Sequence, residues 1–443
     1  MNPTSTSLLS PTRRDFLKAS GAAVSLGVLG AMSLQQSVYA AGSDILKVGM
    51  IGCGGRNTGA GAQALAADKG ARLVAMCDIF MDRVKGARDA IKGEHAEQVE
   101  VPDNQCLVGF DSYKKVIELS DVVCIANAAK FHPIHAFTAI QAGKHVFVEK
   151  PHGIDPMGCR LMQKACDLAK QKNLGIMSGL HSRHHPGYAE TVKRVWDGAI
   201  GEIISIEENF LRAPYVVIPR KQGLSELQWQ CSTQYHFRWL SGDDVPQSLV
   251  HNMDRASWAM KNAVPITCHG LGGRSSMTDP IFGDVFDHHS VVYEYPNGIR
   301  AYAFCRTTTG CYDESSSLIL GSKGKASITS CWISGPNAWQ WKSDNHDPHQ
   351  VDPYQIEHDK LFAGIRSGKA VNSGDHMAQS TMTTVMGQLS CYTGKEVTWE
   401  QVNKSDYFYP PKPEDCRDDM EPPSKLGPNG SYPVYVPGQT QLL

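Results

Sequence analysis

Short apolar runs alternate with helical patterns through the first part of the chain. Runs rich in β-branched residues predict buried strands at 48–51, 73–77, 122–126, 145–148 and 174–177. Patterns with helical spacing lie between them, including 59–69, 135–142 and 157–171. Continuous apolar strands separated by helices are typical of a parallel sheet with helices on both faces. Residues 41–178 are therefore predicted to form a doubly wound α/β domain.

The pattern changes after residue 178. Longer strands with partial alternation are predicted at 203–210, 285–295 and 299–306, with a hairpin signal at Pro296-Asn297-Gly298. A second hairpin is predicted between 318–320 and 326–328, and helices at 359–366 and 377–392. Residues 179–405 should form an α+β domain with an open-faced, mostly antiparallel sheet, through which the chain would form a homo-oligomer. Residues 406–443 are predicted to be an extended Pro-rich tail, over the surface or across a partner.

The composition argues against a nucleic-acid-binding protein. Lys plus Arg number 43 against 45 for Asp plus Glu, without a basic stripe, so nucleic acid is not an expected partner. The 13 cysteines lack metal or disulfide spacing and are expected to be small buried hydrophobes.

The N-terminus has the pattern of a twin-arginine signal over 1–40, with Arg13-Arg14, an apolar stretch at 19–34 and a small-residue site before Ala41. The mature protein is expected to be periplasmic or otherwise exported, without a membrane span.

Glycines break the chain directly after the first strand, at Gly52, Gly54 and Gly55, with Asn57 at the position usually held by a third glycine. A strand, a glycine turn and a helix form the Rossmann geometry that sets backbone N–H groups against a pyrophosphate. Asp78 ends the next strand, 78 − 57 = 21 residues later, where a carboxylate grips a ribose 2′-hydroxyl. NAD is therefore predicted over NADP, a preference that Arg56 in the turn could soften.

Polar residues at later strand ends are candidates for chemistry. Glu149-Lys150-Pro151 follows the strand at 145–148, where the Lys150 ammonium could hydrogen-bond an alcohol that becomes a carbonyl. The alternative without a functional role is a solvated Glu–Lys pair beside a turn proline. Asn127 and His132 lie at the same predicted edge and are candidate cofactor contacts. Candidate substrate contacts are His181, Arg183 and Tyr188, with Arg212, Tyr215, Gln234, Tyr235 and His236 as further polar or aromatic candidates for a sugar site. No metal site is predicted.

These residues resemble the glucose–fructose oxidoreductase/inositol dehydrogenase/MocA (Gfo/Idh/MocA) family. The matching residues are Gly52, Gly54, Gly55, Arg56, Asp78, His132, Glu149-Lys150-Pro151 and the segment 183–203, and the resemblance covers roughly 45–400. It implies that Lys150 lies beside the nicotinamide and that a helix of the second domain carries an Asp-x-x-x-His pair. The best match is 243–254, with His251 as the general base and Gln247 at the usual aspartate position. Asp243 or Asp244 is expected to cap this helix.

Gln247 leaves several mechanisms of proton transfer open, because glutamine can position a hydroxyl but cannot take its proton. His251 works without a carboxylate, or another acid such as Asp243 or Asp244 reaches in, or the usual chemistry is altered. The leading hypothesis is an oxidoreductase that passes hydride between a tightly bound nicotinamide cofactor and a secondary alcohol of a sugar, cyclitol or glycoside. The alternatives are a redox-neutral glycoside hydrolase that uses bound NAD, and a non-catalytic, nucleotide-bound sugar-binding protein.

Overall fold

A parallel sheet of six strands forms the first domain of the computed structural model, which describes residues 45–342 and 351–443. The predicted export signal at 1–40 lies outside the described residues. The strand order is β3-β2-β1-β4-β5-β6, and the chain reverses its direction of winding between β1 and β4. In a doubly wound sheet this reversal marks the ligand crevice. The strands are β1 (Leu46–Ile51), β2 (Ala71–Asp78), β3 (Cys106–Val108), β4 (Val122–Ile125), β5 (His145–Val148) and β6 (Ile176–Ser178).

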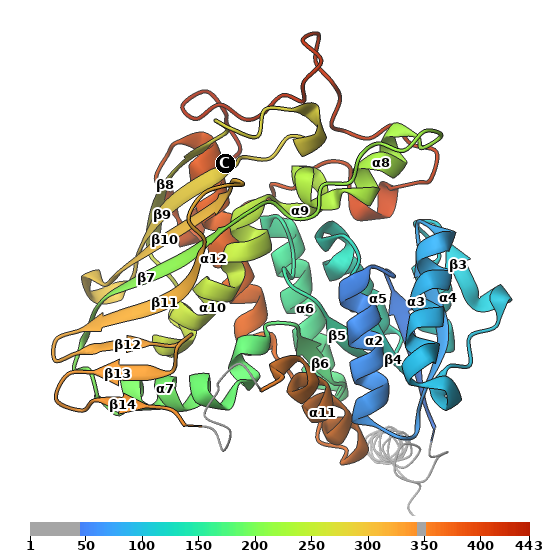
Figure 1. Cartoon of the computed structure of the whole chain (residues 1–443), viewed down its shortest axis with the longest axis horizontal. Coiled ribbons are helices and arrows are strands. Elements are labelled where there is room, and N and C mark those ends of the chain that lie inside the picture. Colours follow the sequence, from blue (N-terminus) through green and yellow to red (C-terminus); the bar gives the residue numbers. More distant parts are fainter. Residues whose placement is uncertain (1–44, 343–350) are drawn as a thin grey trace, which may run out of the picture.

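Helices cover both faces of this sheet, as the apolar strands require (Figure 1). One face is covered by α2 (Gly55–Ala67), α3 (Met81–Glu94) and α11 (Pro353–Arg366), and the other by α4 (Tyr113–Leu119), α5 (His132–Gln141) and α6 (Pro156–Lys172). Helix α11 falls within the predicted second domain by sequence. Its Leu361, Phe362 and Ile365 nevertheless pack with Val48 and Met50 in the core of the first. Helix α2 begins at Gly55 rather than near residue 59, because the helix starts as soon as the turn ends.

A nine-stranded sheet forms the second domain, in the order β14-β13-β12-β11-β7-β10-β9-β8-β15. Only β7 and β10 pair in parallel, so the prediction of a mostly antiparallel sheet is confirmed. The strands are β7 (Ile203–Arg212), β8 (Thr267–Gly273), β9 (His288–Glu294), β10 (Arg300–Thr307), β11 (Glu314–Gly321), β12 (Lys325–Ser327), β13 (Trp332–Ser334), β14 (Trp339–Gln340) and β15 (Val397–Thr398). The predicted hairpin joins β9 to β10, where Asn297 and Gly298 have φ of 67° and 74°.

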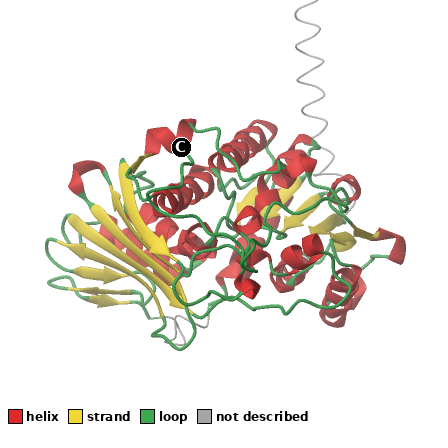
Figure 2. Cartoon of the chain, turned by 90° about the horizontal axis from the view of Figure 1, so that it is seen from above, coloured by secondary structure: helices red, strands yellow, loops and turns green. Residues whose placement is uncertain are grey.

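Helices gather on the side of this sheet that faces the first domain, and the opposite face is open (Figure 2). The longest is α12 (Gly374–Thr393), which is buried on nearly every side because it packs on the sheet, on α10 and on α6. The other helices are α7 (Pro186–Trp196), α8 (Glu226–Ser232), α9 (Arg238–Ser241), the π-helical turn η6 (Val245–Leu249), α10 (Val250–Ala259) and α13 (Trp399–Lys404).

The tail after residue 405 runs extended along the top of the molecule toward α8 (Figure 1). It is anchored to its own chain rather than free. Tyr409 and Tyr432 are each only 3% exposed, and the buried Lys130 donates to the Tyr409 carbonyl at 2.6 Å. The tail therefore belongs to the folded unit and joins both domains.

Two general features of the described residues bear on the predictions. All thirteen cysteines are free thiols, and twelve of them are buried as predicted, whereas Cys311 is exposed. No helix within the described ranges combines the length and the apolar character that a membrane crossing requires.

Candidate active site

The glycine turn after β1 has the shape of a phosphate cradle. Gly52 has φ of +87°, and a β-carbon there would lie 2.7 Å from the backbone of Asn127, so only glycine fits. At Gly54 and Gly55, by contrast, an added β-carbon would meet no protein atom within 4 Å. The turn thus leaves open space at the N-terminus of α2, where backbone N–H groups and the helix dipole favour a pyrophosphate. The residues present fit the predicted dinucleotide.

Asn57 holds this turn together from inside. Its side-chain amide donates to the carbonyls of Ile51, Gly52 and Cys124 at 3.0, 2.6 and 3.2 Å, and the residue is fully buried. A glycine at this position could make none of these bonds. A bound cofactor would therefore meet the backbone of the turn, which Asn57 positions from inside.

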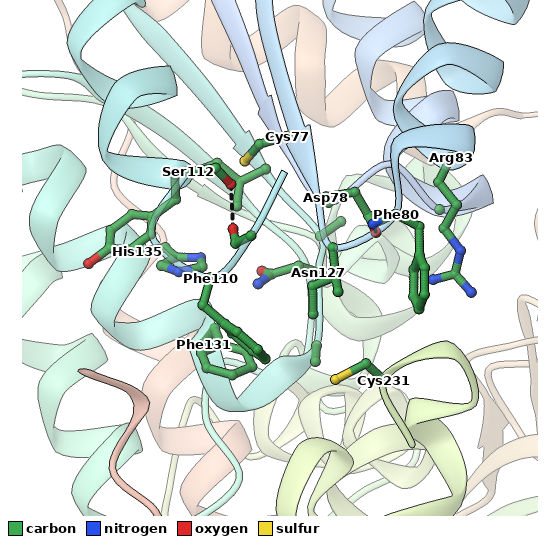
Figure 3. A pocket seen from close by; sticks show the side chains of 18 of the residues that line it. Cys77, Asp78, Phe80, Arg83, Phe110, Ser112, Asn127, Phe131, His135 and Cys231 are labelled. Atoms are coloured by element: carbon green, nitrogen blue, oxygen red, sulfur yellow. Dashed lines mark hydrogen bonds between the residues drawn. The ribbon is translucent and has the colours of Figure 1, made fainter. Parts of the chain in front are cut away.

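Asp78 lies at one end of a cavity beside the turn, at the carboxyl edge of the sheet (Figure 3). Its Oδ2 accepts from the Cys53 N–H at 2.7 Å and its Oδ1 from the Phe80 N–H at 3.1 Å. Two fixed backbone donors hold the carboxylate in place for a ribose. Asn127 projects into the same cavity, as the sequence predicted for this edge. Other side chains that line the cavity are Phe80, Arg83, Phe110, Phe131, His135, Cys231 and Gln234.

Two of these lining residues, Cys231 and Gln234, come from the second domain. Figure 3 shows Cys231 approaching from an element opposite the strands. Arg83 reaches toward the same segment and donates to the Ser232 carbonyl at 3.1 Å. Phe80 and Arg83 follow Asp78 closely and could have been found by extending the nucleotide motif. Cys231 carries no signal of its own, because only the fold brings it to the cavity.

Lys150 lies at the other end of the turn and connects the two domains. Its ammonium donates to the backbone carbonyl of Gln247 at 2.8 Å. The neighbouring Glu149 is buried and pairs with Arg56 of the glycine turn, with 3.3 Å between Oε1 and Nε. Burial raises the pKa of Glu149, against the opposing effect of Arg56. Arg56 and Glu149 thus tie the turn to the strand end that carries Lys150, rather than lining the ribose end.

The turn η6 presents Gln247 to Lys150 through its backbone, and His251 is the second residue of α10, which follows directly. The predicted helix caps are wrong for η6 itself: Asp244 stands at its N-cap without a side-chain cap bond, and Asp243 Oδ1 accepts only from the Asp244 N–H, at 2.6 Å. Asp243 has φ of +71° and accepts from the Phe286 N–H and the Tyr392 hydroxyl at 2.8 and 2.5 Å. Because Lys150 contacts the Gln247 carbonyl, this contact does not depend on which side chain occupies position 247.

The surroundings of His251 favour the neutral form of its imidazole. Burial, and after it the Lys150 ammonium, keep the pKa of its imidazole well below the usual range. His181 packs edge-on against it, with ring centroids 4.9 Å apart, and stacks on Tyr354 at 4.1 Å. The Arg56 guanidinium lies 4.6 Å from the centroid of the same Tyr354 ring. The structure therefore brings His181 to the site, as predicted, and adds Tyr354 of α11, which sequence reasoning missed.

Three predicted contacts lie elsewhere. Arg183 forms a buried ion pair with Asp254, in which its Nε lies 3.0 Å from both carboxylate oxygens, so it is not available to a substrate. Tyr188 stacks on His185 at 4.1 Å in the core of the second domain. The ring nitrogens of His132 face the carbonyls of Pro151 and Asn127 at 2.8 and 3.0 Å, so it fixes two cofactor loops without lining the cavity.

No group of three or more potential ligand side chains within 45–342 and 351–443 lies where it could hold a metal ion. The cavity beside Asp78, the open turn at Gly54 and the Lys150 ammonium instead follow one another along the edge of the parallel sheet. A dinucleotide bound with its ribose at Asp78 and its pyrophosphate at the turn would direct its reactive ring toward Lys150.

Gly54→Ala tests the cradle without disturbing the protein. Gly54 has φ of −75° and ψ of 172°, which alanine adopts freely, and the added methyl meets only open space. We expect the free energy of unfolding without nucleotide to change by less than about 0.5 kcal/mol. The methyl would intrude on the pyrophosphate, so NAD affinity measured by calorimetry should fall by about tenfold or more.

Gly86→Ala in the exposed part of α3 is the matched control, since a β-carbon there also meets nothing. It should leave NAD affinity unchanged. Equal NAD affinity of Gly54→Ala and the unaltered protein would show that no pyrophosphate lies at this turn.

The comparisons with known proteins agree with this geometry. Residues 46–179 match the model described as "Oxidoreductase family, NAD-binding Rossmann fold". An inositol 2-dehydrogenase/D-chiro-inositol 3-dehydrogenase of Halalkalibacterium halodurans is 30% identical over 31% of this chain and 36% of its own length. A glycosyl hydrolase family 109 protein of Bacteroides fragilis is 34% identical over 24% of this chain and 23% of its own. The chain thus spans well under half the length of these two curated relatives.

A solved structure covers both domains. A levoglucosan dehydrogenase in complex with NADH superposes with a TM-score of 0.63 at 17% identity, over 80% of this chain and 98% of the other. This likeness establishes the fold. The family match is confined to residues 46–179, the parallel-sheet domain, which resembles the NAD-binding Rossmann domain of that oxidoreductase family.

Proposed function

We propose that the protein transfers hydride between a retained NAD and a secondary alcohol of a sugar, cyclitol or glycoside. The observation that carries this proposal is the position of Lys150, whose ammonium meets the second domain at Gln247 beside the neutral His251. The inositol dehydrogenase and levoglucosan dehydrogenase among the similar proteins support the substrate class.

The chain's own residues would move the proton. The nicotinamide, when bound, supplies the hydride acceptor. Lys150 has three N–H donors, of which one binds Gln247, so two remain to hold the substrate oxygen. His251, being neutral, takes the hydroxyl proton as the carbon–oxygen double bond forms. Gln247 contributes its carbonyl, and the missing carboxylate at its position is not needed for either step.

The ribose end supports NAD over NADP. Both oxygens of Asp78 are held by backbone N–H groups, so the negative charge is fixed where a 2′-phosphate would lie. Arg56, which could have softened this preference, is directed toward Glu149 and Tyr354 instead.

Retention of the nucleotide is the second part of the proposal. An exported enzyme would meet little free NAD and would keep its cofactor through a second, reductive half-reaction. Support comes from α8, whose Cys231 lines the cavity and whose neighbouring Gln230 donates to the Ser424 carbonyl of the tail at 2.7 Å. The tail also reaches the cavity rim, where Asp418 accepts from the Phe110 N–H at 3.2 Å.

The open face of the nine-stranded sheet supports a homo-oligomer. Leu271, Tyr302 and Leu320 project from this face and are 76%, 37% and 38% exposed. Apolar side chains on an uncovered sheet favour burial against another surface, here a second copy of the chain. The mass of the assembly under native conditions tests this directly.

A second candidate function is redox-neutral glycoside hydrolysis with bound NAD, which the match to a glycosyl hydrolase family 109 protein favours. Nitrophenyl glycosides separate the two functions. Release of nitrophenol without accumulation of reduced nicotinamide would favour hydrolysis, and stoichiometric reduction of the bound nucleotide would favour the dehydrogenase.

Lys150→Met tests the chemical role, since it removes the ammonium and keeps most of the side-chain stem. Reduction of the bound NAD by myo-inositol, D-glucose or D-galactose should slow by roughly 100-fold or more. The nucleotide that co-purifies should be unchanged. Lys164→Met, at an exposed position of α6, is the matched control. Turnover of Lys150→Met at the control rate would refute the role of Lys150.

The pH dependence tests His251. A histidine pKa below its usual value means that the ring stays neutral to lower pH. The acid limb of the activity should therefore lie below the ordinary histidine value of about 6.5. The measurement is kcat/KM for alcohol oxidation against pH, which reports groups of the free enzyme. A midpoint at or above the ordinary histidine value would contradict the account, as would an unchanged acid limb in His251→Gln.

Asp418→Ala tests retention by the tail. Loss of one hydrogen bond at the cavity rim, worth about 1 kcal/mol, should speed release of bound NAD about fivefold. Release can be followed by nucleotide fluorescence after dilution. Asp419→Ala, exposed and adjacent, is the control. Equal release rates for the two variants would mean that the tail does not hold the nucleotide.

A further inference from the structure

A small hollow lies in the second domain, beside η6. We call it the Asp244 hollow, and its lining includes Arg212, Tyr215, Tyr235, His236, Asp244 and Phe286. It has room for about one water-sized group. The sequence marked Arg212, Tyr215, Tyr235 and His236 as candidates for a sugar site without fixing their orientation, and the fold brings all four to this hollow.

The polar groups of the hollow are only partly satisfied. Asp244 uses Oδ1 to accept from Arg212 Nη2 at 2.7 Å and from the Ser248 hydroxyl at 2.5 Å. Its Oδ2 is buried and has no hydrogen-bond partner among the described residues. The same holds, within those residues, for Arg212 Nε and for His236 Nε2. Two of the residues that line the hollow, Asp244 and Arg212, thus carry an acceptor and a donor without a partner among the described residues.

The free groups select the chemistry of what enters. A hydroxyl both donates and accepts, so it can satisfy the Asp244 oxygen and the Arg212 N–H together. A carboxylate or phosphate would be repelled by Asp244, and a methyl group would leave both polar atoms unsatisfied. The Arg212 guanidinium lies only 3.5 Å from the centroid of the Tyr215 ring, which itself stacks on Tyr235 at 4.2 Å. The donor is therefore held in place before a ligand arrives.

The Asp244 hollow is linked to the reaction centre through Ser248. The Ser248 hydroxyl accepts from Arg212 at 2.8 Å and lies 3.0 Å from the Tyr215 hydroxyl. Ser248 directly follows Gln247, whose carbonyl accepts from Lys150. Of two consecutive residues, with Cα atoms about 3.8 Å apart, Gln247 thus contacts the ammonium, and Ser248 contacts side chains that line the hollow.

We propose that the Asp244 hollow binds a single hydroxyl of a polyhydroxylated substrate, at a carbon other than the one oxidised, and selects substrates by the position of that hydroxyl. This inference rests on the proposed function, because it requires a carbohydrate whose reacting oxygen lies at Lys150. It adds a specificity site, formed by Asp244 and Arg212, to the groups that handle the proton.

The test pairs a change in the protein with a change in the substrate. NAD-loaded enzyme is first assayed with myo-inositol, D-glucose and D-galactose, and the monodeoxy analogues of the best substrate are then compared. With the unaltered enzyme, one analogue should lose at least about tenfold in kcat/KM. The Asp244→Ala variant should have a kcat/KM for the parent sugar that is lower than that of the unaltered enzyme by a similar factor. Within this variant, kcat/KM for that analogue should be less than about twofold below the value for the parent sugar. Asp313→Asn, which alters the exposed Arg306–Asp313 pair, is the control and should retain the full discrimination.

The outcomes separate the two proposals. For each deoxy analogue, kcat/KM is compared with that of the parent sugar. If this ratio is the same in Asp244→Ala as in the unaltered enzyme for every analogue, the hollow holds an ordered water only and the inference is overturned. If the unaltered enzyme neither binds nor oxidises any of the three sugars, the proposed function falls and the inference with it. Should Asp244→Ala fail to fold, a crystal structure of the unaltered NAD-loaded enzyme with its best sugar decides. A sugar oxygen between Asp244 Oδ2 and Arg212 Nε supports the inference, and a water there overturns it.

Discussion

The bond from the Lys150 ammonium to the Gln247 carbonyl is the contact on which the site depends. It joins the carboxyl end of a parallel strand in one domain to a π-helical turn in the other. Since the acceptor belongs to the backbone, the bond survives changes of side chain at position 247. The ammonium is thereby held at the edge where a doubly wound sheet binds its ligand.

Buried charge organises the rest of the site around this contact. Glu149 pairs with Arg56, so the strand end and the glycine turn share one ion pair. Arg56 and His181 both contact the Tyr354 ring, and His181 packs against His251. The histidine that would take the proton has a lowered pKa because its ring is desolvated and, after that, because the Lys150 ammonium is near. The glycine turn, the Lys150 ammonium and His251 are therefore connected through side-chain contacts, and α11 contributes Tyr354 to them.

Local sequence patterns predicted those features of the structure that depend on residues close together in the chain. The apolar strands, the glycine turn, Asp78 and the Asn297-Gly298 hairpin follow from short-range rules, and all have the expected form. Arg183 was misread because its partner, Asp254, lies 71 residues away and takes the charge expected for substrate. Tyr354 and Cys231 were missed for the same reason, since only tertiary structure brings α11 and α8 to the site. Asp243 failed as a cap because long-range bonds to Phe286 and Tyr392 fix it in a left-handed conformation.

The central claim is that a dinucleotide lies along the edge of the parallel sheet with its nicotinamide facing Lys150. A crystal structure of the protein with its co-purified nucleotide measures this directly. The account predicts a ribose on the Asp78 carboxylate, the pyrophosphate over Gly54 and Gly55, and the nicotinamide ring in contact with the Lys150 side chain. A nucleotide bound with the Lys150 ammonium turned away from that ring, or a glycine turn blocked by protein side chains, would contradict it.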